Sequence, residues 1–237
     1  MTNTTENRVA IITASGKGMG AAIAGELVAG SYQLVLMSVS GGAEKLASEL
    51  SVIGLTGSVT VPDDLKRLVD TTMERYGRID AVVNNTGHPP AGPLLDLTDD
   101  EWRMGLDLVL LNVIRMSRLV TPIMQAQGGG AIVNISTFAA FEPSETFPIS
   151  ASLRAALGSF TKLYADTYAQ DGIRMNNILP GFVDSYPVSD DVVKQIPMGR
   201  YGSVQEIAKT ARFLLSDEAG YITGQNIRVD GGITRGV

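Results

Sequence analysis

The sequence has no cysteine among its 237 residues. This absence excludes disulfides, thiolate metal sites and a cysteine nucleophile. Histidine occurs once, as His88, and we predict no metal site. No apolar run approaches the length that spans a membrane, and the polar start MTNTTENR lacks the apolar core of a signal peptide. We therefore expect a cytoplasmic protein that has no membrane partner.

Basic residues are fewer than acidic ones: the chain has 19 Lys and Arg and 25 Asp and Glu, which gives a net charge of −6. Nucleic acids and anionic membrane surfaces require basic patches, so we expect a small-molecule substrate and no nucleic-acid partner. Hydrophobic residues make up 44% and charged residues 19% of the chain, which is an ordinary globular balance. A chain of this length can form one domain, which we predict to span residues 1–237.

The stretch RVAIITASGKGMG, from Arg8 to Gly20, predicts a strand, a glycine-rich turn and the start of a helix. Its continuous apolar run is typical of a parallel strand buried on both faces. Glycines in such a turn permit a tight bend and let the backbone approach a pyrophosphate, while the helix start directs free N–H groups at the anion. A plain βα turn is the alternative, but the position directly after the first strand favours a dinucleotide site.

Strand-like and helical segments alternate along the following part of the chain. Strands are expected over residues 33–37, 55–59 and 79–83, and helices over residues 43–50, 65–76 and 102–122. This alternation predicts an α/β fold with a doubly wound parallel sheet of Rossmann type, in which ligands bind at the carboxyl ends of the strands.

The end of the second strand bears on which nicotinamide cofactor is bound. A carboxylate near this point binds the ribose of NAD, but the chain has Ser38-Val39-Ser40 instead. Lys17, inside the glycine loop, is able to meet the 2′-phosphate of NADP. We therefore predict that NADP(H) is preferred over NAD(H), although Lys17 as a merely solvated loop lysine is the alternative.

Five motifs occur in a fixed order: the glycine loop, Asn84-Asn-Thr-Gly87, Ile132-Val-Asn-Ile-Ser136, Pro180-Gly181, and Tyr221-Ile-Thr-Gly-Gln225 with Val229-Asp-Gly-Gly232. Together they resemble the short-chain dehydrogenase/reductase family over essentially the whole chain, most closely its β-ketoacyl-ACP reductase-like members. The resemblance implies a nicotinamide-dependent oxidoreductase acting on a carbonyl or alcohol. It also implies a homotetramer.

The resemblance places cofactor contacts on a set of residues in loops at the strand ends. They are Thr13, Ser15, Lys17, Gly18, Met19, Gly20, Ser38, Ser58, Asn85, Gly87, Arg154, Pro180, Gly181, Val183 and Ser185. The chain departs from the family pattern at two nearby points. Ala14 replaces the first glycine of the loop, and Ser58 stands where an aspartate usually contacts adenine, so we expect weaker binding of the adenine.

The family's proton relay uses a tyrosine, a lysine, a serine and an asparagine, and these positions fall here on Ser150, Arg154, Thr137 and Val109. Ser150 cannot replace the phenol, because an aliphatic hydroxyl has a pKa far above the value of about 10 for tyrosine. Arg154 can still hydrogen-bond a ribose or stabilise an anion. Thr137 keeps a hydroxyl, and Ser136 is a neighbour that can serve instead. We predict an atypical catalytic centre.

Two interpretations of this loss remain open. In the first, the protein is an oxidoreductase that recruits another acid, with His88 as the leading candidate and Tyr186, Asp184 and Glu142 as weaker ones. The alternative for His88 is a loop histidine without a catalytic role. In the second, hydride transfer is lost. The protein is then either a non-redox lyase of halohydrin-dehalogenase-like type or a cofactor-binding protein without turnover. The lyase is considered because an arginine at the lysine position is similar to the pattern of halohydrin dehalogenases.

Overall fold

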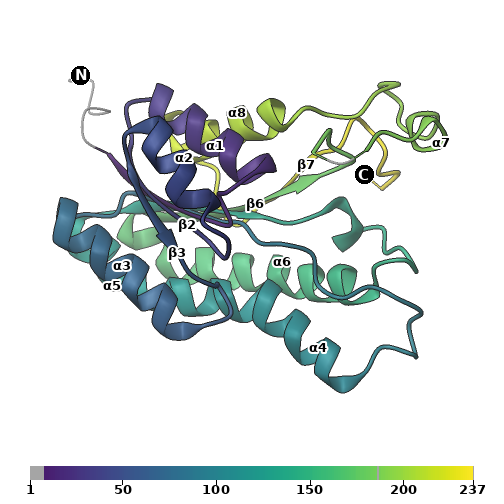
Figure 1. Cartoon of the computed structure of the whole chain (residues 1–237), viewed down its shortest axis with the longest axis horizontal. Helices are drawn as coiled ribbons and strands as arrows, with labels where there is room; N and C mark the ends of the chain where they lie inside the picture. Colours follow the sequence, from purple (N-terminus) through teal and green to yellow (C-terminus); the bar gives the residue numbers. More distant parts are fainter. Residues whose placement is uncertain (1–7, 186, 237) are drawn as a thin grey trace.

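The computed structural model describes residues 8–185 and 187–236 (Figure 1). A parallel sheet of seven strands crosses the middle of the molecule in the order β3-β2-β1-β4-β5-β6-β7. The strands are β1 (Val9–Thr13), β2 (Gln33–Ser38), β3 (Ile53–Thr56), β4 (Ala81–Asn84), β5 (Gly130–Ile135), β6 (Ile173–Pro180) and β7 (Asn226–Val229). The predicted α/β fold with a doubly wound parallel sheet is confirmed.

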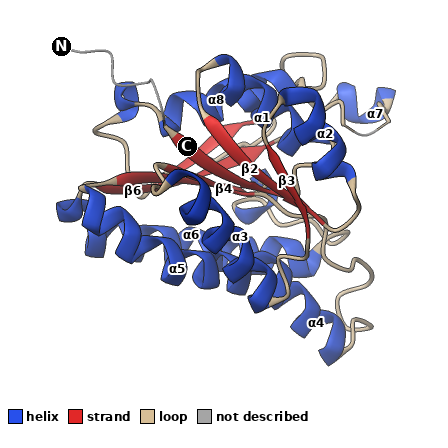
Figure 2. Cartoon of the chain, turned by 60° about the vertical axis from the view of Figure 1, so that its left-hand side comes forward, coloured by secondary structure: helices blue, strands red, loops and turns tan. Residues whose placement is uncertain are grey.

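Helices cover both faces of this sheet (Figures 1 and 2). One face carries α1 (Gly18–Ala29), α2 (Gly42–Leu50) and α8 (Val204–Leu215). The other carries α3 (Pro62–Tyr76), α4 (Asp99–Leu106), α5 (Asn112–Gln127) and α6 (Pro148–Tyr168). The short α7 (Asp190–Val193) lies beyond the end of α8, in the segment that follows β6. No helix in the described part of the chain is long and apolar enough to cross a membrane.

The alternation of side chains along the strands divides the hydrophobic core into two layers. On β1, Ile12 packs toward α1 and α8, whereas Ile11 packs toward α3 and α5. Both isoleucines are fully buried, as expected for a central strand that is covered on both faces. The continuous apolar run in the sequence therefore corresponds to a central strand.

The third strand begins earlier than predicted, at Ile53 rather than residue 55. The difference arises at Gly54, where α2 passes so close that a Cβ atom would lie 2.6 Å from the carbonyl oxygen of Ala43. Only glycine tolerates this approach, and it breaks the apolar pattern that marks a strand. The strand also ends earlier, at Thr56, and the amide of Gly57 donates the last hydrogen bond of this pairing to the carbonyl of Ser38, at 2.9 Å.

The long helix predicted over residues 102–122 contains a π-helical segment, Asp107–Leu111, between α4 and α5. The side-chain amide of Asn112 donates to the carbonyl oxygen of Leu108 next to this segment. A π turn widens a helix locally and often occurs at functional sites. Here it places Leu108 on the wall of a cavity.

Candidate functional site

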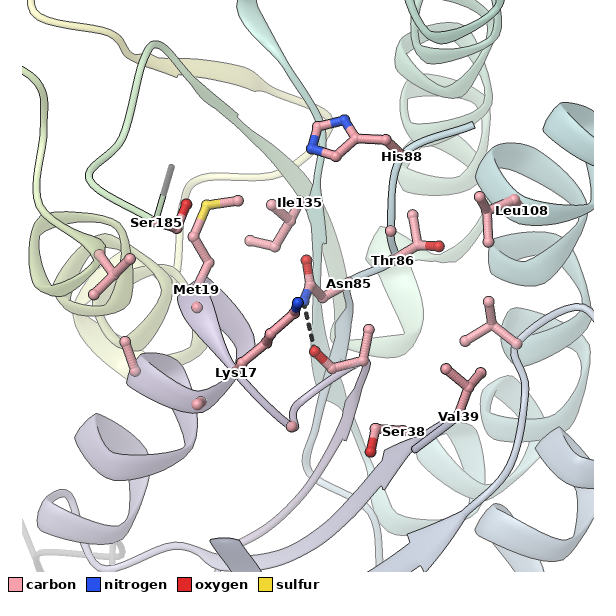
Figure 3. Close-up of a pocket in the computed structure, with 18 of the residues that line it drawn as sticks. Lys17, Met19, Ser38, Val39, Asn85, Thr86, His88, Leu108, Ile135 and Ser185 are labelled. Carbon is pink, nitrogen blue, oxygen red and sulfur yellow. Dashed lines mark hydrogen bonds between the residues drawn. The ribbon is translucent and has the colours of Figure 1, made fainter. Parts of the chain in front are cut away.

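A cavity of about 1040 Å³ lies at the carboxyl ends of the strands (Figure 3). Its walls come from the loop between β1 and α1, the ends of β2, β4 and β5, and α6. The sheet order runs from β1 to β3 on one side and from β4 to β7 on the other, so the chain changes direction between β1 and β4. Open α/β sheets bind ligands in the crevice at such a switch point.

The glycine loop forms one end of the cavity. Lys17, Gly18 and Met19 line it at the start of α1, and this helix has no side chain capping its first N–H groups. These N–H groups are therefore available to an anion. Gly20 has no room for a side chain, because a Cβ atom there would lie 2.5 Å from the carbonyl oxygen of Ala14.

Two residues predicted to bind cofactor hold the loop in place instead of lining the cavity. The Thr13 hydroxyl donates to the carbonyl of Asn85 at 2.7 Å and accepts from its amide at 3.0 Å. Ser15 bonds to the carbonyl of Met37 through both its amide, at 3.1 Å, and its hydroxyl, at 3.3 Å. The Asn85 side chain in turn donates to the carbonyl of Ala14 at 3.1 Å, the dashed line in Figure 3.

A second end of the cavity lies against β2 and the loop after β3. Ser38 lines it, and its hydroxyl accepts from the amide of Ala43 at 2.9 Å. Ser58 lines it as well, and its hydroxyl bonds to that of Thr60 at 2.8 Å. Among the described lining residues at this end there is no carboxylate.

The wall opposite the glycine loop carries Arg154, Ser136 and His88. Arg154 is 6% exposed; its Nη1 donates to the carbonyl of Ile135 at 2.6 Å and its Nε to the hydroxyl of Ser150 at 3.2 Å. Burial lowers the pKa of Arg154 to about 10, which still leaves the guanidinium charged at neutral pH. The Ser136 hydroxyl is buried and has no hydrogen-bond partner among the described residues.

His88 extends from the loop after β4 over Ile135, toward the side of the cavity formed by Met19 and Ser185 (Figure 3). Partial burial, together with the charge of Arg154, lowers the pKa of its imidazole below the ordinary value of 6.5. The ring is therefore mostly neutral at pH 7 and suited to accept a proton rather than to donate one.

Several predicted site residues lie outside the cavity lining. The Thr137 hydroxyl accepts from the amide of Ala139 at 3.4 Å and so caps the turn Phe138–Ala140. Ser150 is buried behind Arg154, one helical turn earlier on α6. Val109 is buried in the π-helical segment.

Most of the residues at and after the end of β6 that were predicted to contact the cofactor do not line the cavity. Pro180 ends the strand. A side chain on Gly181 would collide with the backbone of Asp230, at 2.7 Å. Val183 forms a bridge to Gly202. Of the residues in this segment that were predicted to contact the cofactor, Ser185 alone lines the cavity within the described part of the chain.

The three weaker acid candidates have different surroundings. Asp184 lines the cavity, but its Oδ1 accepts from the amide of Val204 at 2.9 Å, at the start of α8. Glu142 accepts from the backbone amides of Arg235 and Gly236 and so holds the C-terminal segment. Tyr186 lies outside the described residues.

Sequence reasoning missed a further group of lining residues, which includes Val39, Thr86, Leu108, Val204 and Gln205. Val39 is the first residue after β2 and Thr86 the second after β4, so the rule that ligands bind at strand ends could have found them. Leu108 and the two residues at the start of α8 are brought to the cavity by packing. The sequence carries no local signal for their position.

The fold and this cavity can be compared with known proteins. A family model described as enoyl-(acyl carrier protein) reductase matches residues 13–234. The 3-oxoacyl-(acyl-carrier-protein) reductase FabG of Salmonella typhimurium is 33% identical over 238 residues, covering 96% of this chain and 98% of that protein. Dehydrogenase/reductase SDR family member 4 of Caenorhabditis elegans is 32% identical over 248 residues, covering 96% of this chain and 95% of that protein.

The structural comparison gives a similar result. L-Sorbose reductase from Gluconobacter frateurii, in a crystal structure with NADPH and L-sorbose, matches with a TM-score of 0.91 and 28% sequence identity. The match covers 98% of both chains. The likeness therefore extends over the sheet, both helical layers and the loops at the strand ends.

Proposed function

Because the chain belongs to the short-chain dehydrogenase/reductase family, we propose that it is an NADP(H)-dependent oxidoreductase that interconverts a carbonyl and an alcohol at an atypical catalytic centre. The main support is that one cavity connects the glycine loop at Lys17 with the wall formed by Ser136 and Arg154. A dinucleotide needs such an extended site, with an anion-binding helix start at its middle.

The residues of the cavity fit an NADP(H) molecule. Free N–H groups at Gly18 and Met19 would hold the pyrophosphate, and Ser38 and Ser58 would border the adenosine. A bound nicotinamide supplies or receives the hydride. The preference for NADP over NAD is supported by Lys17, an exposed cation at the glycine loop, and by the lack of a lining carboxylate near Ser38 in the described part of the chain.

The atypical centre is proposed from the groups that face the inner wall. Ser150 would replace the expected tyrosine, but its hydroxyl is occupied by Arg154 and lies behind the cavity. Arg154 keeps its charge and cannot shuttle a proton at neutral pH. His88, largely neutral, would accept the proton of an alcohol. This arrangement favours alcohol oxidation near neutral pH over ketone reduction.

Three finer expectations belong to the same proposal. A homotetramer is supported by the family and by exposed apolar side chains on α6, such as Leu163. A cytoplasmic location and a small-molecule substrate are consistent with the similarity to reductases. The dehalogenase-like alternative has no support among the compared proteins, whose printed names describe reductases and dehydrogenases.

The atypical centre is tested by restoring the family's relay with Val109→Asn, Ser150→Tyr and Arg154→Lys together. NADPH consumption would be followed with a panel of ketones, and NADP⁺ reduction with the matching alcohols, for both proteins. We expect the restored protein to reduce ketones at least about tenfold faster, because general acid catalysis contributes roughly 10²–10⁴-fold. Equal ketone reduction by the two folded proteins would contradict the claim that the relay is broken.

A further inference from the structure

The cation on the inner wall of the cavity has no anionic partner. Arg154 makes one bond to a backbone carbonyl and one to a hydroxyl, and no carboxylate within residues 8–185 and 187–236 pairs with it. A buried charge is costly unless it is paired. The missing negative charge therefore points to a ligand.

A second arginine, Arg174, shows what a structural role looks like in this protein. Arg174 is partly buried, and its guanidinium donates to the carbonyls of Leu214 at 2.7 Å, Ser216 at 2.9 Å and Ile222 at 3.4 Å. Both of its terminal nitrogens are bonded to backbone. Arg154 has fewer such bonds, one from Nη1 to a backbone carbonyl and one from Nε to a hydroxyl, and its side chain borders the cavity.

A second, independent observation lies beside Arg154. Ser136 lines the same wall and is 7% exposed, and its buried hydroxyl has no partner among the described residues. A buried polar atom without a partner is costly, so this hydroxyl is also available to bind a ligand. Ser136 follows Ile135, whose carbonyl holds Arg154, so one strand end positions both donors.

We propose that Arg154 and Ser136 form a carboxylate-binding subsite, and that the substrate is a carbonyl or hydroxy compound that carries a carboxylate. The planar guanidinium matches the geometry of a carboxylate, and the serine hydroxyl donates to it as well. The choice of substrate class rests on the proposed function. Binding of the carboxylate does not, because the subsite is built from the protein alone.

The test measures binding without any nucleotide. Acetoacetate and its neutral methyl ester differ chiefly in the carboxylate charge, and their affinities would be compared by calorimetry. We expect acetoacetate to bind at least about thirtyfold more tightly, since losing one partner of a buried charge pair costs about 2 kcal/mol or more. Equal affinity for the two compounds would overturn the proposal, and so would tighter binding of inorganic phosphate at this wall.

Two variants and a control locate the subsite. Arg154→Gln removes the charge but leaves an amide that can still donate to Ile135, and Ser136→Ala removes one hydroxyl. Acetoacetate affinity should fall at least about thirtyfold in the first and about fivefold in the second. Lys209→Gln, an exposed change on α8, should leave it unchanged. Unchanged affinity in a folded Arg154→Gln protein, checked by circular dichroism, would contradict the assignment.

A final arm adds NADP⁺ to the acetoacetate-bound protein. If both bind together, the carboxylate subsite is distinct from the nucleotide site. Displacement of acetoacetate by NADP⁺ would overturn the proposal by assigning Arg154 to the nucleotide. Acetoacetate binding in a protein that does not bind NADP⁺ at all would leave the subsite standing and contradict the proposed function instead.

Discussion

Ala14 shows how a single residue can depart from a family pattern and still support the same loop. It has a φ of +45°, a conformation that glycine adopts freely and alanine does not. Its carbonyl oxygen nevertheless contacts Gly20 and accepts from Asn85, so the loop around it is fixed on two sides. The surrounding contacts therefore hold Ala14 in an unfavourable conformation.

We expect Ala14→Gly to raise the free energy of unfolding by roughly 1 kcal/mol, because a left-handed conformation costs an alanine about 1–2 kcal/mol. Urea unfolding followed by circular dichroism measures the change. Ala156→Gly, at an exposed position inside α6, is the matched control and should lower stability by about 1 kcal/mol. A loss of stability in Ala14→Gly would show that the strain is absent.

The residue scale also limits what the sequence can predict. The glycine loop could be recognised because its residues are adjacent, and the structure places Lys17, Gly18 and Met19 on the cavity. The burial of Arg154 and the unpartnered hydroxyl of Ser136 depend on packing between β5 and α6. No local sequence pattern indicates such packing, so the proposed carboxylate-binding subsite could not be predicted from the sequence.

Among the elements, four neighbouring strands are joined by a ladder of asparagines, of which Asn84, Asn134 and Asn177 are buried and Asn226 is partly buried. Asn84 on β4 donates to Asn134 on β5 at 2.8 Å, Asn134 to Asn177 on β6 at 2.9 Å, and Asn177 to Asn226 on β7 at 2.7 Å. Thr161 of α6 donates to Asn177 at 2.9 Å. The ladder therefore fixes the strand that ends at Ile135 relative to α6 and to its neighbours.

Asn134→Ala should lower the free energy of unfolding by about 3 kcal/mol, because both Asn84 and Asn177 lose a buried partner. Asn226→Ala, at the end of the ladder, removes one such bond and should cost roughly 1 kcal/mol. Chemical unfolding of the two variants under the same conditions measures the difference. Equal losses would indicate that the asparagines act singly rather than as a ladder.

Element types were predictable where the apolar pattern has a clear period, as in β1 and α3. The structure differs from the predicted elements at two places, and hydrophobic periodicity contains no signal for either difference. Gly54 interrupts the pattern of β3 because α2 approaches it closely, and the π-helical segment Asp107–Leu111 has the same apolar character as the helices around it. Leu108 of the π-helical segment lines the cavity.

At the scale of the whole molecule, the switch between β1 and β4 gathers loops from both halves of the sheet around one cavity, which Figure 3 shows in close-up. In the proposed function, the glycine loop binds the nucleotide at one end of the cavity. The wall that carries Arg154, Ser136 and His88 binds the substrate and accepts its proton at the other end. Nucleotide binding and proton transfer in this proposal therefore rest largely on different residues.

The central claim, that this cavity is an NADP(H) site, is tested most directly by calorimetric titration of the wild type and Lys17→Gln with NADPH and NADH. We expect the wild type to bind NADPH about tenfold more tightly than NADH, because a charged hydrogen bond contributes roughly 1.5 kcal/mol or more. Lys17→Gln should lose this preference and keep its affinity for NADH. Absence of binding by either nucleotide at millimolar concentration, or a preference for NADPH that survives in Lys17→Gln, would contradict the account.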